Sequence, residues 1–329
     1  METLWFCLAA FSLTGYVVLD GFDLGAGIIH LFAARSNEQR RVLLASIGPF
    51  WDANEVWLLA SGGTIYFAFP ALYASSFSGF YLPLMIVLWL LILRGIAIEF
   101  RNHIESAVWT PLWDVVFSGA SALLAIFLGA AIGNVVRGVP LDHEGEFFLP
   151  LWGEVGILDP YTIATGLFAL AALTLHGALW VNLKTDLPIR GAITTWAWRA
   201  TALLTTLVTW ATFRVQPLVP FSFAVRPWGF CFPAIAVLGL LAAYDPKKEQ
   251  RAFAGSCAFL IAMMASVAFG IYPNVLPSLA GNGGSSLTIY NTATGSYGLG
   301  VGLAWWLPGM LLATGYAFFL YRRFTGKLE

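Results

Sequence analysis

The sequence predicts an all-α, polytopic integral membrane protein with about nine transmembrane helices in a single domain, residues 1–329. Three observations predict this fold class. Apolar residues make up 59% of the chain and charged residues 11%, whereas an ordinary soluble domain carries about 25% charged residues. Apolar stretches long enough to cross a bilayer recur along the whole chain, and Lys and Arg gather in alternate connections between them.

Nine windows of roughly 19 residues are candidate spans. They are residues 4–32, 46–69, 79–99, 113–136, 160–182, 200–219, 228–244, 252–272 and 298–320. Each is near or above the ~17 residues that a helix needs to cross the hydrocarbon core. No stretch outside them is long enough to form a separate core, so we expect one transmembrane domain.

The basic residues predict the orientation of the chain. Of the 17 Lys and Arg, 14 lie in the loops after the first, fifth and seventh spans, at the end of the third span, and in the tail. The other three, Arg137, Arg214 and Arg226, fall on the opposite side. Because basic loops stay in the cytoplasm, we expect the N-terminus outside and the C-terminus cytoplasmic. An odd number of spans agrees with this orientation.

Composition also excludes several classes of function. The net charge is −1, so no nucleic-acid-binding surface is expected. Cys7, Cys231 and Cys257 lie in apolar segments without CxxC spacing, which argues against a disulfide framework or a metal site. No Lys or Arg precedes Arg35, so the chain lacks the basic n-region of a cleaved signal peptide, and the first span is expected to remain.

Two acidic clusters lie inside the first two apolar spans. Asp20 and Asp23 are three residues apart in the first span, and Asp52 and Glu55 are three apart in the second. Residues at this spacing share one face of a helix. A carboxylate at bilayer depth costs at least about 2.5–3.5 kcal/mol, and such groups usually handle ions or protons.

The two clusters are expected at matching depth. The first span runs toward the cytoplasm and the second returns, so the clusters lie on adjacent antiparallel helices. At 1.5 Å per residue, Asp23 and Glu55 are each about 14 Å from the cytoplasmic end of their span, and Asp52 about 9 Å. A ladder of carboxylates reaching in from the cytoplasm suits proton movement.

A structural interpretation of the same residues stays open. Gly21, Gly25 and Gly27 could break the first helix, with the neighbouring aspartates capping the break, or could let helices approach closely. Arg94 and Arg101 lie near the depth of the acids and could neutralise them in structural ion pairs.

Other polar positions give weaker indications. His176 is the only histidine placed for haem ligation in a span, which would also need a second axial ligand; a histidine satisfied by protein groups is the alternative. The outer loop at residues 137–159 is acidic and expected in solvent. The loop at residues 273–297 is polar but uncharged, and we expect it to pack on a partner or to fold back onto the membrane face.

Two motifs resemble subunit II of the cytochrome bd quinol oxidases. They are Leu-Asp-Gly-Phe-Asp-Leu-Gly at residues 19–25 and Ile-Gly-Pro-Phe-Trp-Asp-Ala-Asn-Glu-Val-Trp-Leu at residues 47–58. Weaker similarities follow at residues 73–81, 93–101, 272–278 and 286–293. The resemblance therefore covers nearly the whole chain.

The resemblance implies a nine-helix subunit of a bacterial inner-membrane complex. Its partner would be subunit I, which carries haem b, haem d, and the quinol and oxygen sites. Some family members also hold a small accessory single-span subunit. The complex would oxidise quinol and reduce dioxygen to water, taking protons from the cytoplasm, and this chain would ligate no haem of its own.

The resemblance also implies roles for individual residues. Asp20, Asp52 and Glu55 would lie on the cytoplasmic proton path, although glutamine also occurs in the family at the position of Glu55. A further set would be supporting polar groups or lie near a structural quinone: Asp23, Trp51, Asn54, Trp57, Arg94 and Arg101. An ion- or proton-coupled secondary transporter is the alternative function that buried carboxylates and broken helices would also suit.

Overall fold

The computed structural model describes residues 1–150, 156–187, 191–279 and 284–328, and they confirm the all-α class. The helices are α1 (Glu2–Ala33), α2 (Asn37–Ile47), α3 (Trp51–Ala68), α4 (Pro70–Gly79), α5 (Tyr81–Phe100), α6 (Trp109–Arg137), α7 (Pro160–Lys184), α8 (Gly191–Val215), α9 (Leu218–Val225), the 3₁₀ helix η1 (Pro227–Phe230), α10 (Cys231–Ala242), α11 (Glu249–Ile271) and α12 (Ser296–Arg323). Two short strands, β1 (Asn274–Leu276) and β2 (Leu287–Thr288), pair antiparallel.

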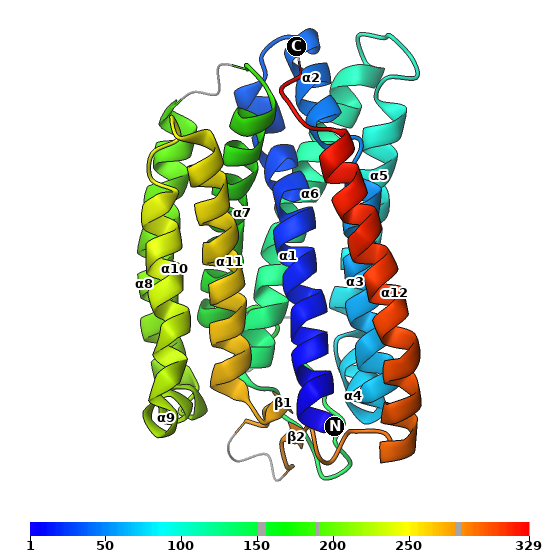
Figure 1. Cartoon of the computed structure of the whole chain (residues 1–329), viewed down its shortest axis with the longest axis vertical. Coiled ribbons are helices and arrows are strands. Elements are labelled where there is room, and N and C mark those ends of the chain that lie inside the picture. The colour runs from blue at the N-terminus through cyan, green and yellow to red at the C-terminus, as the bar shows by residue number, and fades with distance from the viewer. Residues whose placement is uncertain (151–155, 188–190, 280–283, 329) are drawn as a thin grey trace.

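The long helices lie side by side along one axis, and the two termini lie at opposite ends of the bundle (Figure 1). Six of the described helices are long and apolar enough to cross a membrane, and up to eight spans result if each of two sharply bent pairs is one span. The pairs are α3 with α4, bent by 120°, and α9 with η1 and α10, bent by 108°. The chain is therefore a multi-pass membrane protein, but the count of nine is not confirmed.

Helix α8 accounts for the missing ninth span. It covers the expected span at residues 200–219 but is rich in threonine, which lowers its hydropathy. Four of its threonine hydroxyls donate to the carbonyl oxygen four residues earlier, among them Thr201 to Ala197 and Thr212 to Val208 at 2.8 and 2.7 Å. The helix therefore satisfies these polar groups internally, as polar side chains in lipid must be satisfied.

Proline residues divide the chain more finely than hydropathy predicts. The expected span at residues 46–69 is interrupted at Gly48 and Pro49: α2 ends before them and α3 begins at Trp51. Pro49 has no backbone N–H with which to continue the hydrogen-bond ladder of α2, which explains the break. The loop expected at residues 33–45 contains most of α2, which begins with a capping box between Ser36 and Gln39.

The glycines of α1 serve close packing. Helix α1 runs unbroken through them, so the hypothesis of a helix break capped by aspartates is wrong. A Cβ atom on Gly25 would collide with the backbone of α7, and one on Gly177 of α7 would collide with the backbone of α1. The two helices therefore touch backbone to backbone, as glycine allows in membrane bundles.

The polar loop at residues 273–297 folds onto its own chain. Leu276, Leu287 and Ile289 are buried together with Trp5 and Val139 at the end of the bundle that holds the N-terminus. The described residues of this loop therefore pack on their own bundle, and contact with a partner or with the membrane face stays a prediction.

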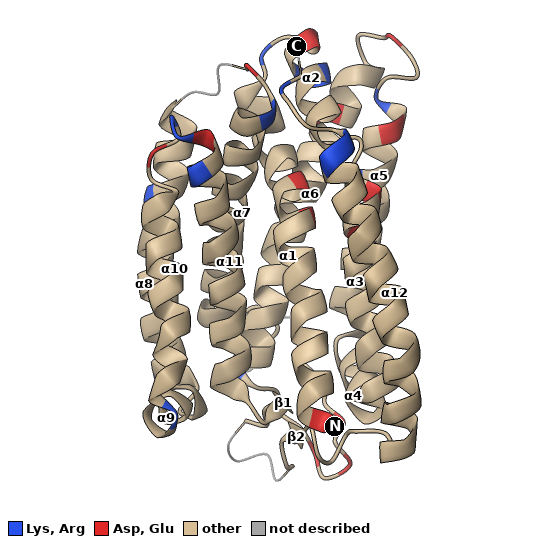
Figure 2. Cartoon of the chain, viewed as in Figure 1, with Lys and Arg blue, Asp and Glu red and all other residues tan. Residues whose placement is uncertain are grey.

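Charged residues concentrate at the bundle ends. Figure 2 shows Lys and Arg gathered mainly at the end that holds the C-terminus. Two acids and an arginine lie well inside that end, on α1, α3 and α5, and they form the first candidate site.

Candidate functional site

A buried ion pair joins α1 to α5. Asp20 and Arg94 are both 0% exposed. Arg94 Nη1 donates to Asp20 Oδ2 at 2.8 Å and Nη2 donates to Oδ1 at 2.6 Å. This bidentate geometry is the strong form of a carboxylate–guanidinium pair. The structural interpretation, that Arg94 neutralises an acid of α1, is confirmed for this pair.

Glu55 of α3 shares the same guanidinium. Arg94 Nη2 also donates to Glu55 Oε1 at 2.8 Å, and the Glu55 side chain is 26% exposed. Two carboxylates therefore compete for one positive charge, so the group carries an excess of one negative charge when both are ionised. One added proton would balance the group without leaving Arg94 unpaired.

Asp23 and Asn54 form the next layer of the site. Asn54 Nδ2 donates to Asp23 Oδ2 at 2.7 Å and to the Leu19 carbonyl oxygen at 3.0 Å. The hydroxyl of Tyr321 donates weakly to Asn54 Oδ1 at 3.4 Å. Asp23 Oδ1 has no hydrogen-bond partner among the described residues, and neither does the buried hydroxyl of Tyr16. The site therefore keeps hydrogen-bonding capacity that the protein itself does not use.

These contacts also establish the depth of the site. Asn54 lies level with Leu19 and Asp23 on the antiparallel helix α1. Asp23 is ten residues before the end of α1 at Ala33, which is about 15 Å at 1.5 Å per residue. The sequence predicts that the two acidic clusters face each other across the first hairpin. The structure shows this for Asp20 and Asp23 of α1 and for Asn54 and Glu55 of α3.

Asp52 lies apart from the buried pair. It is in the first turn of α3, and its side chain is exposed on the outer face of the chain, with no hydrogen bond to any described residue. It precedes Glu55 by one helical turn, so the two can be neighbours along the surface of α3. Asp52 is thus placed at the outer edge of the site, next to the half-buried Glu55.

The two tryptophans near the acids pack against glycines. Trp57 is 6% exposed and covers Gly15 of α1. Trp51 is half-buried and lies against Gly95 of α5. Neither indole donates a hydrogen bond to a carboxylate of the described residues, so the geometry of both supports packing around the site.

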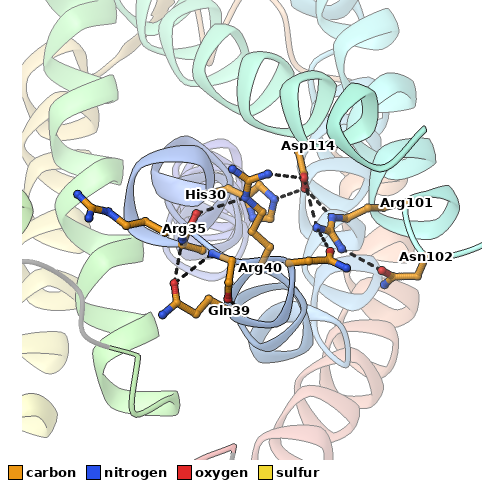
Figure 3. A network of polar contacts seen from close by, with 10 residues as sticks. His30, Arg35, Gln39, Arg40, Arg101, Asn102 and Asp114 are labelled. Carbon is orange, nitrogen blue, oxygen red and sulfur yellow. Dashed lines mark hydrogen bonds and ion pairs between the residues drawn. The ribbon is translucent and has the colours of Figure 1, made fainter. Parts of the chain in front are cut away.

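Arg101 lies elsewhere, in a second polar network (Figure 3). It is 1% exposed and holds Asp114 of α6 through Nε and Nη2. Asp114 Oδ1 also accepts from His30 Nε2 at 2.6 Å, and Oδ2 accepts from Arg40 Nη1 at 2.8 Å. The expectation that Arg101 neutralises the acids of the first two spans is wrong.

The sequence contained a signal for this second network. Asp114 is the only acid in the span at residues 113–136, and it lies at the same end of the bundle as Arg101. A lone carboxylate at that depth needs a positive partner. The network joins α1, α2, α5 and α6.

His176 is held by protein groups on both sides of its ring. Nε2 donates to the Val18 carbonyl oxygen at 2.9 Å, and Nδ1 lies 2.7 Å from the Ser256 hydroxyl. The ring also stacks on Phe253, with 5.0 Å between centroids. To ligate haem iron, His176 would have to give up one of these hydrogen bonds. No group of three or more His, Cys, Asp or Glu that could hold a metal ion occurs within the described ranges.

Comparison with known proteins identifies the family. The family model for cytochrome bd terminal oxidase subunit II matches residues 1–324. A probable cytochrome oxidase subunit 2 of Haemophilus influenzae is 28% identical, over 100% of this chain and 95% of its own length. The cytochrome bd ubiquinol oxidase subunit 2 of Bacillus subtilis is 31% identical, over 92% and 89% of the two chains.

Two further comparisons agree. The cytochrome bd-I ubiquinol oxidase subunit 2 of Escherichia coli K12 is 33% identical over 65% of this chain, which is 56% of that protein. A chain of the bd oxidase from Geobacillus thermodenitrificans has the same fold, with a TM-score of 0.75 over 98% of both chains at 19% identity. This chain belongs to the family of cytochrome bd terminal oxidase subunit II.

Proposed function

We propose that this chain is the haem-free subunit II of a cytochrome bd-type quinol oxidase in the bacterial inner membrane. In this proposal the complex couples quinol oxidation to the reduction of dioxygen to water, and this chain supplies part of the proton path from the cytoplasm. The observation that supports the path is the pair of carboxylates, Asp20 and Glu55, that share Arg94. Family membership over the whole chain argues against the secondary transporter.

The proposed path runs from the outer face of α3 inward. Asp52 is exposed and takes up the proton, Glu55 is half-buried and passes it on, and Asp20 receives it in the interior. Arg94 holds the two inner carboxylates within reach of one nitrogen, since both accept from its Nη2. A proton that neutralises either carboxylate leaves the other paired with the guanidinium, so the buried positive charge always has a partner.

The exposure of Asp52 and Glu55 suggests that a partner subunit covers the side of the bundle where α3 lies. Asp52 and Glu55 are partly open to the surroundings at membrane depth, where contact of a carboxylate with lipid is costly. Helix α12 lies beside α3, and only 6% of its apolar stretch is buried. We propose that subunit I, with haem b and haem d, covers the flank formed by α3 and α12. Asp52, where the proposed path begins, would then lie at this interface.

The roles of the remaining predicted residues stay proposals. Asp23 and Asn54 support the site by hydrogen bonding, and Trp51 and Trp57 by packing. A structural quinone near Arg94 would find one guanidinium donor, Nε, without a partner among the described residues, whereas Nη1 and Nη2 already bind carboxylates. A small accessory subunit, lipid and quinol are further partners that the family implies.

The proton path is tested by Asp52→Asn in the assembled complex. Because Asp52 is exposed and bonds to no described residue, its replacement by an amide should leave the fold intact. We expect oxygen uptake per haem d to fall by tenfold or more, about 1.4 kcal/mol in the barrier. Glu55→Gln also removes a carrier of the proposed path and should lower turnover, but less than Asp52→Asn, because glutamine also occurs in the family at the position of Glu55.

Glu38→Gln is the matched control, because Glu38 is an exposed acid of α2 at the same end of the bundle. It should keep full turnover. Full turnover in a well-assembled Asp52→Asn complex would remove Asp52 from the path. Loss of haem and of assembly, with normal turnover in the surviving complex, would instead support a structural role.

A further inference from the structure

A long groove on the outside of the bundle has no role in the proposed proton path. It lies between α1, α7 and α8 and has a volume of about 950 Å³. Its walls are almost entirely apolar, with Phe32, Leu167 and Trp196 among them, and these three side chains are 44–69% exposed. The groove is therefore open to whatever surrounds the subunit on this side.

One end of the groove carries positive charge. Arg35 follows the end of α1 and lines the groove. Figure 3 shows its guanidinium pointing away from the Asp114 network. Arg199 of α8 is not part of the lining, but it lies over the ring of Trp196, which is, with 5.6 Å to the centroid. Neither arginine makes an ion pair with a residue in the described ranges.

The groove has the length of one membrane leaflet. On α8 its lining runs from Ala192 to Leu204, which are twelve residues apart. Twelve residues of helix span about 18 Å, and half of a hydrocarbon core of about 30 Å is about 15 Å. The groove thus reaches from the basic end of the bundle to about the middle of the membrane.

From these observations we infer that the groove binds an anionic phospholipid of the cytoplasmic leaflet. The acyl chains lie along the apolar walls, and the phosphate lies at Arg35 and Arg199. Basic pockets between transmembrane helices at the cytoplasmic side bind such head groups. A quinone head group is neutral and would leave both arginines without a counter-charge, as would an apolar transmembrane helix from a partner.

The experiment measures lipid retained by the full chain, purified in mild detergent with the subunit that copurifies. The protein is incubated with equal amounts of phosphatidylglycerol, phosphatidylethanolamine and ubiquinone, and bound molecules are counted by native mass spectrometry. We expect the unmodified protein to retain phosphatidylglycerol in preference to the other two. Retention should fall about fivefold in Arg35→Gln, the effect expected of one basic residue at the membrane surface, and it should be largely restored in Arg35→Lys.

Two further variants separate the groove from general charge attraction. Ala200→Phe fills the groove without changing charge, and it should also lower the retention of phosphatidylglycerol. Arg322→Gln removes an exposed arginine of α12 at the same end of the bundle, outside the groove, and should change nothing. Equal retention by the unmodified protein and both groove variants would overturn the inference. Preferential retention of ubiquinone or phosphatidylethanolamine that Ala200→Phe abolishes would overturn it as well.

Discussion

At the scale of single residues, the two buried networks differ in their balance of charge. Arg94 forms ion pairs with two carboxylates, those of Asp20 and Glu55, so its network has an excess of negative charge. Asp114 contacts two arginines, Arg40 and Arg101, and a histidine, so its single negative charge faces at least two positive charges. An added proton relieves the first imbalance and worsens the second. The first network is therefore suited to proton transfer and the second to holding helices together.

Asp114→Asn is expected to destabilise the chain strongly. It leaves Arg101 buried without its carboxylate, and breaking a buried ion pair from one side costs about 3–5 kcal/mol. Arg41→Gln is the matched control, because Arg41 pairs with Glu105 at the same end of the bundle, but on the surface. It should cost less than about 1 kcal/mol. Thermal unfolding of both variants in the same detergent checks this difference, and equal losses would contradict it.

At the scale of elements, the contact between α1 and α7 depends on glycine. Gly177→Ala should force the two helices apart and lower the free energy of unfolding by about 1–3 kcal/mol, the usual cost of overpacking. Gly119→Ala, on the open face of α6, meets no atom within 4 Å and should cost nothing. Unfolding of the purified variants compares the two. A Gly177→Ala protein as stable as Gly119→Ala would show that the helices can shift without penalty.

Hydropathy predicted the long helices well and the short ones poorly. Six of the expected spans coincide with helices long and apolar enough to cross a membrane, because an apolar run of that length fills the 19-residue window. Helices α2, α4 and α9 are 11, 10 and 8 residues long. A 19-residue window averages the hydropathy of such a short helix with that of the adjoining segments, so the helix is not detected by itself. Their ends depend on prolines and caps, which a hydropathy average does not register.

The acids were easier to predict than their partners. Burial cost alone singles out Asp20, Asp23, Asp52 and Glu55 in the sequence. Depth alone did not distinguish Arg94 from Arg101. Arg94 lies in α5 and Arg101 directly follows its last residue, seven positions later, which is about 10 Å along the helix. They share a face but meet acids at different levels, so which acid each one binds depends on how α1 and α6 pack against α5.

At the scale of the whole molecule, the position of the termini gives a test of orientation. The termini lie at opposite ends of the bundle, and the basic residues gather at the end of the C-terminus (Figures 1 and 2). A fluorescent protein fused after Glu329 should therefore fluoresce, and a reporter that requires the periplasm should be silent there. The reverse result would turn the bundle over and direct the proposed proton path to the other side of the membrane.

The exposure of α12 bears on how long the subunit persists in the membrane without its partner. Its apolar stretch is 6% buried, and its main neighbour within the chain is α3. Without a partner, most of the apolar surface of α12 faces lipid, and Asp52 and Glu55 of α3 stay open to lipid. Surplus subunit made in excess of its partner should thus be recognised by membrane proteases and cleared, which would keep the two polypeptides in equal numbers without any dedicated regulator.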